Sequence, residues 1–423
     1  MNKMKDRFVS LLRSSERYTN LDMVYFASGS FWQTFGQACN SALALVLVIV
    51  FANFLPKETY GTYRYLISLA SVLNVLTLTG MSQAVAQAVA NGRDGALRTS
   101  VRYQLKWNLL LMLASWVVGA YYIWNANFSY GIALFVLSLS TPFSAALNTY
   151  GPYLGAKRQF RLNNIFGVLS TFIYVLGMLV AIFVSGEVIW LIIAYAVTTA
   201  GANILFYALT LHMFHPPIEP ADDVLKYGRH LTYIELMTPV VAQLDSILLT
   251  HFWGPAQLAI YSIAMAIPNR VVPFIKNLVN VGFPKIVTKT VDELDRRLYQ
   301  RLAQGILIGI ACAGAYALVA PYLFKYLLSQ YLDAVFYTQL LAASFVFAMP
   351  TRYVSILLTA KRQSKAIFIT NLINNILLLV LYIALGTLGG ILGLITAKLI
   401  VSFLGFLTNL SAWLLVRKRI ADY

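Results

Sequence analysis

The stretch Ala156-Lys-Arg-Gln159 recurs as Ala360-Lys-Arg-Gln363, and this repetition decides how the chain is organised. A second pair lies earlier in each half, where Phe54-Leu-Pro-Lys-Glu-Thr-Tyr-Gly-Thr-Tyr63 corresponds to Phe252-Trp-Gly-Pro-Ala-Gln-Leu-Ala-Ile-Tyr261. The shifts of the two pairs, 204 and 198 residues, are nearly equal. Two matches at nearly one shift indicate an internal repeat, so we predict two similar halves.

The composition excludes several classes of protein. Of the 423 residues, 59% are hydrophobic and 11% are charged, whereas a soluble domain carries about 25% charged residues. The chain therefore cannot cover a water-facing surface, which excludes a soluble globular, a disordered or a secreted disulfide-linked protein. The two cysteines, Cys39 and Cys312, lie in apolar runs and are expected to be small packing residues.

The apolar runs are long enough to cross a membrane, since a spanning helix needs about 20 mostly apolar residues. Six spans in each half is an even number, so both halves enter the membrane from the same side. The predicted fold class is an all-α polytopic membrane protein with two six-helix lobes, related by a parallel pseudo-twofold axis. The twelve predicted spans lie near residues 23–53, 59–90, 104–125, 129–155, 162–185, 188–213, 229–252, 255–284, 302–324, 334–359, 366–386 and 389–416.

The spans divide the chain into five parts. Residues 1–22 are basic and amphipathic and carry no apolar signal-peptide core, so we expect a helix on the membrane surface. The first lobe covers 23–213, and a linker over 214–228 joins it to the second lobe at 229–416. A basic tail follows at 417–423.

Charge sets the orientation in the membrane. The net charge of +16 comes from 32 Lys and Arg against 16 Asp and Glu. In a soluble protein it would suggest nucleic acid, but most of these bases flank alternate loops, where they resist translocation. Both termini are therefore predicted to be cytoplasmic, and the basic stripes are expected to lie against anionic membrane lipid rather than nucleic acid.

Several charges remain inside the predicted spans, where a charge is costly and usually faces a cavity or a partner. The bases outnumber the acids, so the intramembrane region is predicted to prefer an anion, and Arg in particular suits phosphate. Arg64 and Lys276 have an alternative, which is to snorkel to the membrane surface. The acids either pair with the bases or couple an ion. The bases are Arg64, Arg270, Lys276, Arg352 and Lys398, and the acids are Glu235, Asp245 and, at the first entrance to the membrane, Asp22.

Polar side chains also recur at helical spacing within the spans. They are predicted to line a cavity, although contacts between helices explain such faces equally well. These residues are Gln33, Gln37 and Asn40 in the first predicted span, Asn277 in the eighth and Asn374 in the eleventh.

Short motifs then carry a resemblance to a known family. They are Tyr60-Gly-Thr-Tyr63, Ala259-Ile-Tyr-Ser262, Phe283-Pro-Lys285 and Gly389-Gly-Ile-Leu-Gly393. With twelve spans in two lobes, the chain resembles the lipid-linked oligosaccharide flippases, the Wzx-type (O-antigen) exporters of the polysaccharide transporter family in the MOP superfamily. The resemblance covers essentially the whole chain.

The resemblance implies a MATE-like fold with a V-shaped central cavity in the bacterial inner membrane. It implies a transporter, not an enzyme, that uses no cofactor and no metal and works as a monomer. By alternating access it would move undecaprenyl-diphosphate-linked oligosaccharide to the outer leaflet, with polysaccharide assembly proteins as candidate partners. By position, Arg270, Arg352 and Lys398 would hold the diphosphate.

Two other functions compete with this one. A MATE-like multidrug exporter coupled to H⁺ or Na⁺ would need acidic residues, which Asp22 and Glu235 supply, but the excess of bases disfavours it. A membrane polysaccharide polymerase would need a large outer loop and clustered carboxylates or histidines. His212 and His215 have no further ligands nearby in the sequence, and no phosphate-binding loop indicates ATP hydrolysis.

Overall fold

A computed structural model describes residues 23–280, 286 and 291–421 of the chain. The described residues form helices and connecting turns without a strand, and the contacts group them into two compact units, residues 1–243 and 244–423. The predicted fold class, an all-α polytopic membrane protein, is confirmed. The expected surface helix over 1–22, including Asp22, lies outside the described residues.

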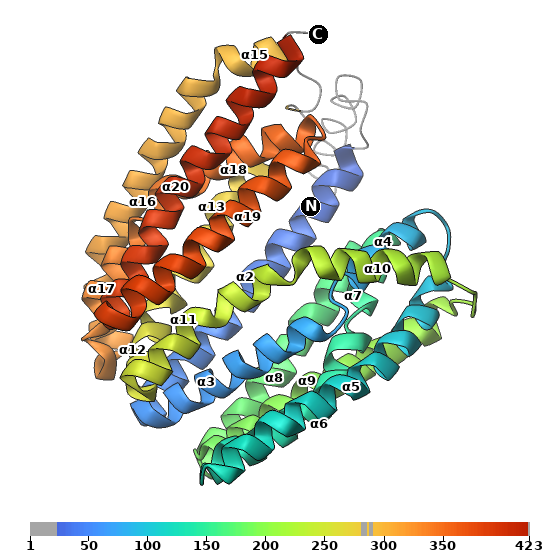
Figure 1. The fold of residues 1–423 in the computed structure, drawn as a ribbon, viewed down its shortest axis with the longest axis vertical. Helices are drawn as coiled ribbons and strands as arrows, with labels where there is room; N and C mark the ends of the chain where they lie inside the picture. The colour runs from blue at the N-terminus through green and yellow to red at the C-terminus, as the bar shows by residue number, and fades with distance from the viewer. Residues whose placement is uncertain (1–22, 281–285, 287–290, 422–423) are drawn as a thin grey trace, which may run out of the picture. The chain divides into compact units, whose positions relative to one another are not determined.

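The first unit is built from long apolar helices that pack side by side (Figure 1). Several of them agree closely with the predicted spans. Their bounds are α2 Met23–Phe54, α3 Lys57–Leu73, α4 Met81–Ala90, α5 Ala96–Trp124, α6 Phe128–Leu147, α7 Tyr150–Ala156, α8 Phe160–Val184, α9 Val188–Phe214 and α10 Asp222–Glu235, followed by the start of α11 Met237–Trp253.

The second unit continues from α11 and consists of a further set of helices. Pro273 and Pro350 lie inside two of them, α13 and α18, where each proline removes a backbone hydrogen bond. The bounds are α12 Pro255–Ala266, α13 Pro268–Asn280, α15 Val291–Arg296, α16 Leu298–Leu327, α17 Ala334–Ala342, α18 Phe345–Ala360, α19 Ser364–Leu381 and α20 Thr387–Ala421, with a π-helical turn at Tyr382–Gly386.

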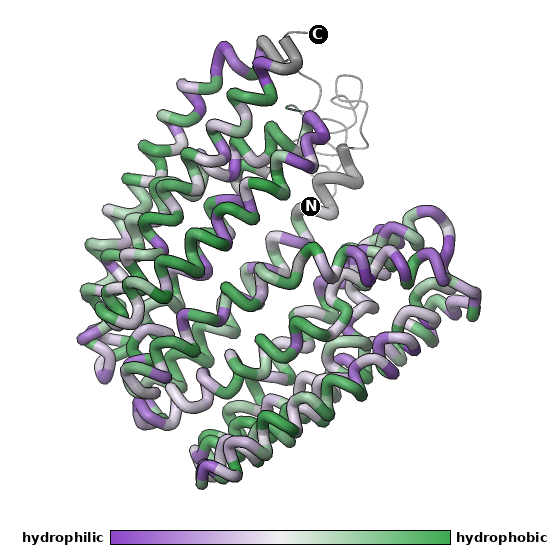
Figure 2. The backbone as a smooth tube through the Cα atoms, viewed as in Figure 1, coloured by the Kyte–Doolittle hydropathy of each residue, from purple (hydrophilic) through white to green (hydrophobic). Residues whose placement is uncertain are grey.

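The described residues contain nine helical stretches that are long and apolar enough to cross a membrane. A tenth is the predicted span 59–90, which is two helices, Lys57–Leu76 and Met81–Ala90, bent by 55°. The bend follows from the extended conformation of Thr77 between them. Along most helices the middle is apolar and polar residues collect at the ends, as a bilayer requires (Figure 2).

One of these stretches, Ser364–Lys418, is 55 residues long. At about 1.5 Å per residue it would be far longer than the roughly 30 Å hydrocarbon layer. It instead turns back on itself, since Gly390 has φ 54° and ψ −132° and α19 packs against α20 (Figure 1). The predicted spans 366–386 and 389–416 are therefore two helices, although the total of twelve spans stays a prediction.

The repeated Ala-Lys-Arg-Gln motif forms the same turn in both units. Arg158 and Arg362 both adopt the left-handed conformation, with φ 62° and 54°. The backbone N–H of the following residue, Gln159 or Gln363, donates to the carbonyl five residues earlier at 2.9 Å in each case. This is the Schellman end of a helix, usually occupied there by glycine. The sequence repeat is thus a repeat of local structure.

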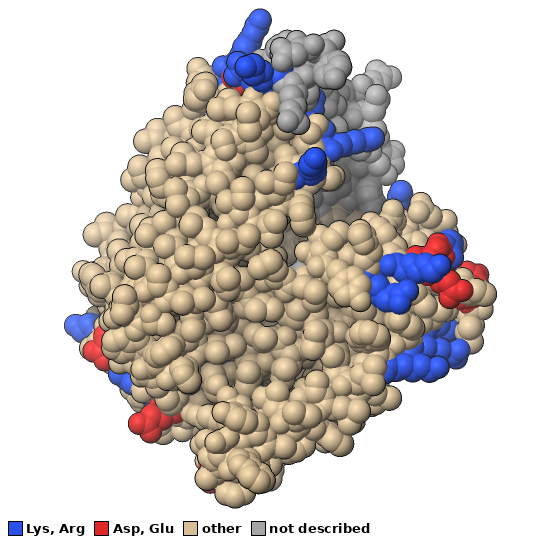
Figure 3. All heavy atoms as spheres, viewed as in Figure 1, with Lys and Arg blue, Asp and Glu red and all other residues tan. Residues whose placement is uncertain are grey.

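Part of the predicted linker between the lobes is helical. Helix α10 begins inside the predicted linker and packs against α4 in the first unit, where Gly80 N–H donates to Thr232 Oγ1 at 3.1 Å. Arg93 adds an ion pair to Asp223 at 2.5 Å. Helix α10 ends at Glu235, so the predicted span 229–252 is divided at Leu236. Lys, Arg, Asp and Glu gather over this end of the unit (Figure 3).

Candidate functional site

A cavity of about 380 Å³ opens within the second unit. It lies between α13, α18, α19 and α20, which pack against one another in sequence order around it. Eight of its nine lining residues have polar or charged side chains, which is unusual within apolar helices. The lining residues are Pro273, Lys276, Asn277, Thr351, Arg352, Ser355, Asn371, Asn374 and Asn409.

Helical spacing explains how these side chains come together. On α13, Pro273, Lys276 and Asn277 are separated by three and four residues and so share one face. On α18, Thr351 and Ser355 are likewise four residues apart, with Arg352 beside them. Each of the two helices therefore places one cation and its polar neighbours on the side that faces the cavity.

The opposite wall carries carboxamides. Asn374 on α19 is held by Thr408 of α20, whose Oγ1 donates to Asn374 Oδ1 at 3.2 Å. Gly405 lies against this amide, because a Cβ there would lie 3.4 Å from Asn374 Nδ2. The Nδ2 group of Asn409, one turn further on, donates to the Gly405 carbonyl at 2.8 Å. The wall is therefore ordered by contacts between α19 and α20.

The charge of the cavity is positive. Lys276 and Arg352 line it, and none of the described lining residues is acidic. Lys276 is exposed and Arg352 is half-buried, and two like charges that line one cavity repel each other. An anion between them removes this repulsion, and the arginine fork can donate two parallel hydrogen bonds to a phosphate. The cavity is therefore suited to bind an anion.

A second set of charged residues lies apart from the cavity lining. Lys398 Nζ on α20 donates to Asp245 Oδ2 on α11 at 2.9 Å, and Tyr261 Oη on α12 donates to the same oxygen at 2.7 Å. The other carboxylate oxygen accepts from Ser246 N–H at 2.6 Å. Lys398 Nζ also lies 5.1 Å from the centre of the Tyr261 ring. We call these residues the Asp245 cluster.

The cluster gives Lys398 a partner other than an anion in the cavity. The sequence grouped Lys398 with the bases that hold an anion, but the structure places it against Asp245, and it is not among the residues that line the cavity. For Asp245, the structure shows the charge pairing that was one of its two alternatives. The sequence placed both an acid, Asp245, and a base, Lys398, in predicted spans. Because the two residues are 153 positions apart, their spacing did not indicate that they pair.

The other predicted bases lie elsewhere. Arg270 is exposed on α13 and is not among the lining residues. Arg64 is half-buried on α3 in the first unit, next to Tyr63, whose hydroxyl lies 3.1 Å from that of Tyr174. Of the five predicted bases, the cavity thus brings together Lys276 and Arg352.

The predicted polar residues divide in the same way. Asn277 and Asn374 line the cavity, whereas α2 of the first unit carries Gln33 and Gln37, both exposed, and the half-buried Asn40. Glu235 is the last residue of α10, and its side chain lies outside the described part of the structure. The cavity is also lined by Thr351, Ser355, Asn371 and Asn409, which the predicted polar residues do not include. Ser355 and Asn371 each lie three residues, about one helical turn, from a predicted residue, Arg352 or Asn374, whereas Asn409 has no predicted residue within a turn of it.

Together, the fold and the cavity define a polytopic helical membrane protein with a basic, amide-rich cavity in its second unit. The family model described as "Polysaccharide biosynthesis protein" matches residues 26–276, more than half of the chain. The chain therefore belongs to this polysaccharide biosynthesis protein family, as the resemblance in the sequence had indicated. No curated protein matches the chain by sequence.

Solved structures share the fold at low sequence identity. The lipid II flippase MurJ in an inward closed conformation has a TM-score of 0.70 at 14% identity, over 91% of this chain and 87% of that one. An inward-facing multidrug resistance transporter of the MATE family, MOP superfamily, has a TM-score of 0.65 at 15% identity, over 89% and 96%. An outward-facing MATE transporter has a TM-score of 0.55 at 16% identity, over 93% and 96%. These likenesses show that the chain shares its fold with MurJ and with MATE transporters.

Proposed function

We propose that the chain is a flippase for undecaprenyl-diphosphate-linked oligosaccharide, and that it moves this cargo from the inner to the outer leaflet of a bacterial inner membrane. The oligosaccharide is a repeat unit of a surface polysaccharide, of which an O-antigen unit is one example. The observation that carries the proposal is the basic, amide-rich cavity in the second unit. Membership of the polysaccharide biosynthesis protein family supports it.

The two cations suit the diphosphate. A diphosphate presents several oxygens over a short distance, so Arg352 can bind one phosphate through its fork while Lys276 binds the other as a point charge. A singly charged anion would neutralise only one of the two positive charges, those of Lys276 and Arg352. The pair of cations therefore favours a ligand with two adjacent negative groups.

The amide wall suits a carbohydrate. Sugar hydroxyl groups both donate and accept hydrogen bonds, and so do the carboxamides of Asn371, Asn374 and Asn409 and the hydroxyl groups of Thr351 and Ser355. Helices α13 and α18 contribute the two cations as well as polar side chains, whereas α19 and α20 contribute carboxamides alone, so the cavity has a charged wall and an uncharged wall. A sugar diphosphate has a charged part and an uncharged, hydroxyl-rich part, which match these two walls.

The architecture supports transport rather than catalysis. The chain contains an internal repeat, and its fold resembles those of MATE transporters solved in inward-facing and outward-facing conformations. Alternating access with both termini cytoplasmic, and function as a monomer alongside polysaccharide assembly proteins, belong to the same proposal. The lipid tail of the cargo stays in the bilayer throughout.

A cation-coupled multidrug exporter is the second candidate. The likeness of the fold to MATE transporters supports an exporter, just as its likeness to MurJ supports a flippase. Such an exporter needs a carboxylate that binds H⁺ or Na⁺. The buried carboxylate of Asp245 already faces the ammonium group of Lys398 at 2.9 Å. A positively charged drug would also meet two cations in the cavity, which favours the flippase.

The test uses the full chain in liposomes that contain a polyprenyl-diphosphate oligosaccharide with a fluorescent sugar. A membrane-impermeant quencher reports how fast the labelled head group changes leaflet. Lys276→Gln and Arg352→Gln should each slow this exchange about tenfold or more, since a hydrogen bond to a charged group contributes about 1.5–3 kcal/mol. Drug efflux from the same vesicles should be absent.

Matched controls separate binding from folding. Lys325→Gln and Arg297→Gln make the same substitutions at exposed positions on or beside α16 and should leave the exchange rate unchanged. All four variants should melt at temperatures close to that of the unsubstituted protein. Normal exchange by both cavity variants, or efflux of a cationic drug that depends on Asp245, would refute the proposal.

A further inference from the structure

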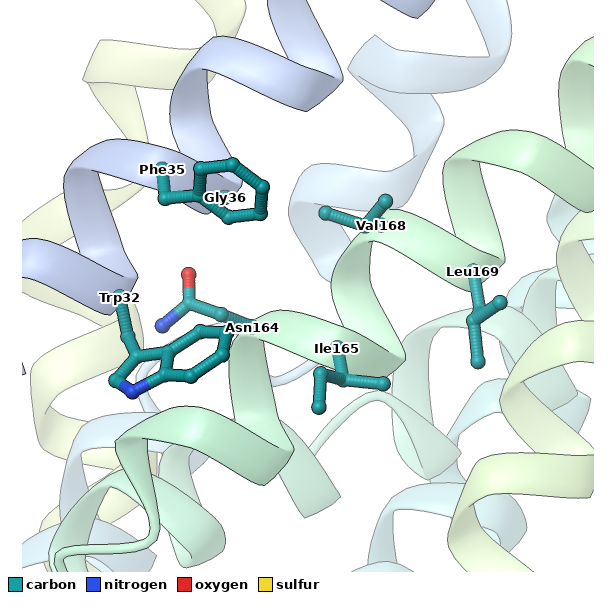
Figure 4. A pocket seen from close by; sticks show the side chains of 7 residues that line it. All are labelled: Trp32, Phe35, Gly36, Asn164, Ile165, Val168 and Leu169. Atoms are coloured by element: carbon teal, nitrogen blue, oxygen red, sulfur yellow. The ribbon is translucent and has the colours of Figure 1, made fainter. Parts of the chain in front are cut away.

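A narrow apolar slot lies in the first unit between α2 and α8, apart from anything the proposed function uses (Figure 4). Its volume is about 140 Å³. Trp32 and Phe35 project from α2 on one side, and Ile165, Val168 and Leu169 project from α8 on the other (Figure 4). Gly36 and Asn164 complete the lining.

The close approach of the two helices forms one wall of this slot. A Cβ at Gly36 would lie 2.5 Å from Asn164 Oδ1, and a Cβ at Gly29, one heptad earlier, would lie 3.0 Å from the ring of Phe160. At these two glycines the backbone of α2 therefore packs directly against side chains of α8. The aromatic rings of α2 stand beside it, where Phe31 is 61% exposed and Phe35 is 51% exposed, with their ring planes nearly parallel.

A cation lies against one of the aromatic residues that line the slot. The guanidinium group of Arg161, in the first turn of α8, lies 5.2 Å from the centre of the Trp32 ring. Arg161 and Asn164 are three residues apart, and Ile165, Val168 and Leu169 follow on the same face of α8. The wall of the slot on α8 thus runs from Asn164 to Leu169, which is about 7.5 Å, and the cation precedes it by one turn. Arg161 is therefore a base whose guanidinium group lies over a lining residue of the slot.

We propose that this slot binds an anionic phospholipid of the bilayer, with the phosphate on Arg161 and one acyl chain along Ile165 and Val168. The charge of Arg161 complements the phosphate, and the apolar lining complements the chain. A volume of about 140 Å³ spread over this length is narrow, which favours a straight acyl chain over a methyl-branched polyprenyl chain. The bound lipid would fix the packing of α2 on α8.

The experiment places the full chain in nanodiscs with a phosphatidylglycerol that carries a photoreactive diazirine in its acyl chain. The same diazirine chain on phosphatidylcholine, and a diazirine polyprenyl phosphate, form the other two arms. Mass spectrometry then maps the labelled residues. We expect residues 32–36 and 164–169 to be labelled about fivefold more by the phosphatidylglycerol, because one base near the membrane surface contributes about 1 kcal/mol toward an anionic lipid.

Three variants make the test specific. Arg161→Gln, at an exposed position, should remove the preference for phosphatidylglycerol, and Val168→Trp should fill the slot and abolish labelling there. Val180→Trp is the control, since Val180 is a 63% exposed residue of α8 outside the slot, and it should label as the unsubstituted protein does. Equal labelling by the two phospholipids, stronger labelling by the polyprenyl phosphate, or unchanged labelling in both slot variants would overturn the proposal.

Discussion

Replacing Asp245 by asparagine removes the negative charge that Lys398 faces inside the second unit. The side chain of Asp245 is 6% exposed and that of Lys398 is 22% exposed, so the lysine keeps only partial access to solvent. Loss of one partner from a buried ion pair costs about 3–5 kcal/mol. Because Lys398 is partly exposed, we expect Asp245→Asn to lower the free energy of unfolding by about 3 kcal/mol. Tyr261 also loses its charged acceptor.

A double-mutant cycle measures this interaction. The variants are Asp245→Asn, Lys398→Met and the two combined, and their free energies of unfolding are compared in mixed micelles. The combined variant has no buried charge left, so its stability should return to within about 1 kcal/mol of the unsubstituted protein, with a coupling energy of about 2 kcal/mol or more. Asp223→Asn, in an exposed pair, should have a smaller effect than Asp245→Asn. If the combined variant loses as much as the sum of the single variants, the pairing argument is wrong.

Three further outcomes are expected. Gly80→Val should destabilise the protein by about 1–3 kcal/mol and speed hydrogen exchange in α10, because a Cβ at Gly80 would lie 2.5 Å from the backbone nitrogen of Thr232. The Arg93 guanidinium holds the pKa of Asp223 at about 2, below its usual 3.8; this lowered pKa stabilises the folded state above about pH 4. Hydrogen exchange at the start of α10 should therefore not change between pH 8 and 5, once corrected for its intrinsic rate, and should speed up only as the pH falls from about 4 toward 2. Arg362→Gly should raise the melting temperature, since it removes a left-handed non-glycine residue that costs about 1 kcal/mol; a lower melting temperature would mean that the Arg362 side chain stabilises the helix end.

Much of the fold followed from hydropathy alone. The predicted spans 162–185 and 188–213 agree with α8 and α9 to within two residues, because each is a continuous apolar run bounded by polar turn residues. The span at 229–252 did not agree. Its beginning belongs to α10, an amphipathic helix whose apolar side packs on α4. A helix that is apolar on one side because it covers a neighbour has the same pattern as one that begins a membrane span.

The site could be predicted only in part. Lys276 and Arg352 were recognised because each is a base within an apolar run, and both line the cavity. The predicted depth of a base in the membrane does not indicate which side chain it contacts. Lys398 was therefore grouped with Lys276 and Arg352, although it pairs with Asp245. The amide of Asn409 was missed because one polar residue in a long apolar helix is also what an interhelical contact requires. Only the packing of α19 against α20 shows whether such a polar residue lines a cavity or contacts a neighbouring helix.

The backbone reversal at Gly390 has a consequence for the cavity some distance away. Asn374 precedes this residue by 16 positions and Thr408 follows it by 18, so the two side chains that meet at 3.2 Å lie at nearly equal distances along the two arms. At about 1.5 Å per residue, each arm measures roughly 25 Å. An insertion or deletion of one residue in either arm would rotate that arm by about 100° and turn the carboxamides away from the cations. The spacing of the arms, more than the identity of any apolar residue along them, sets the alignment of the binding wall.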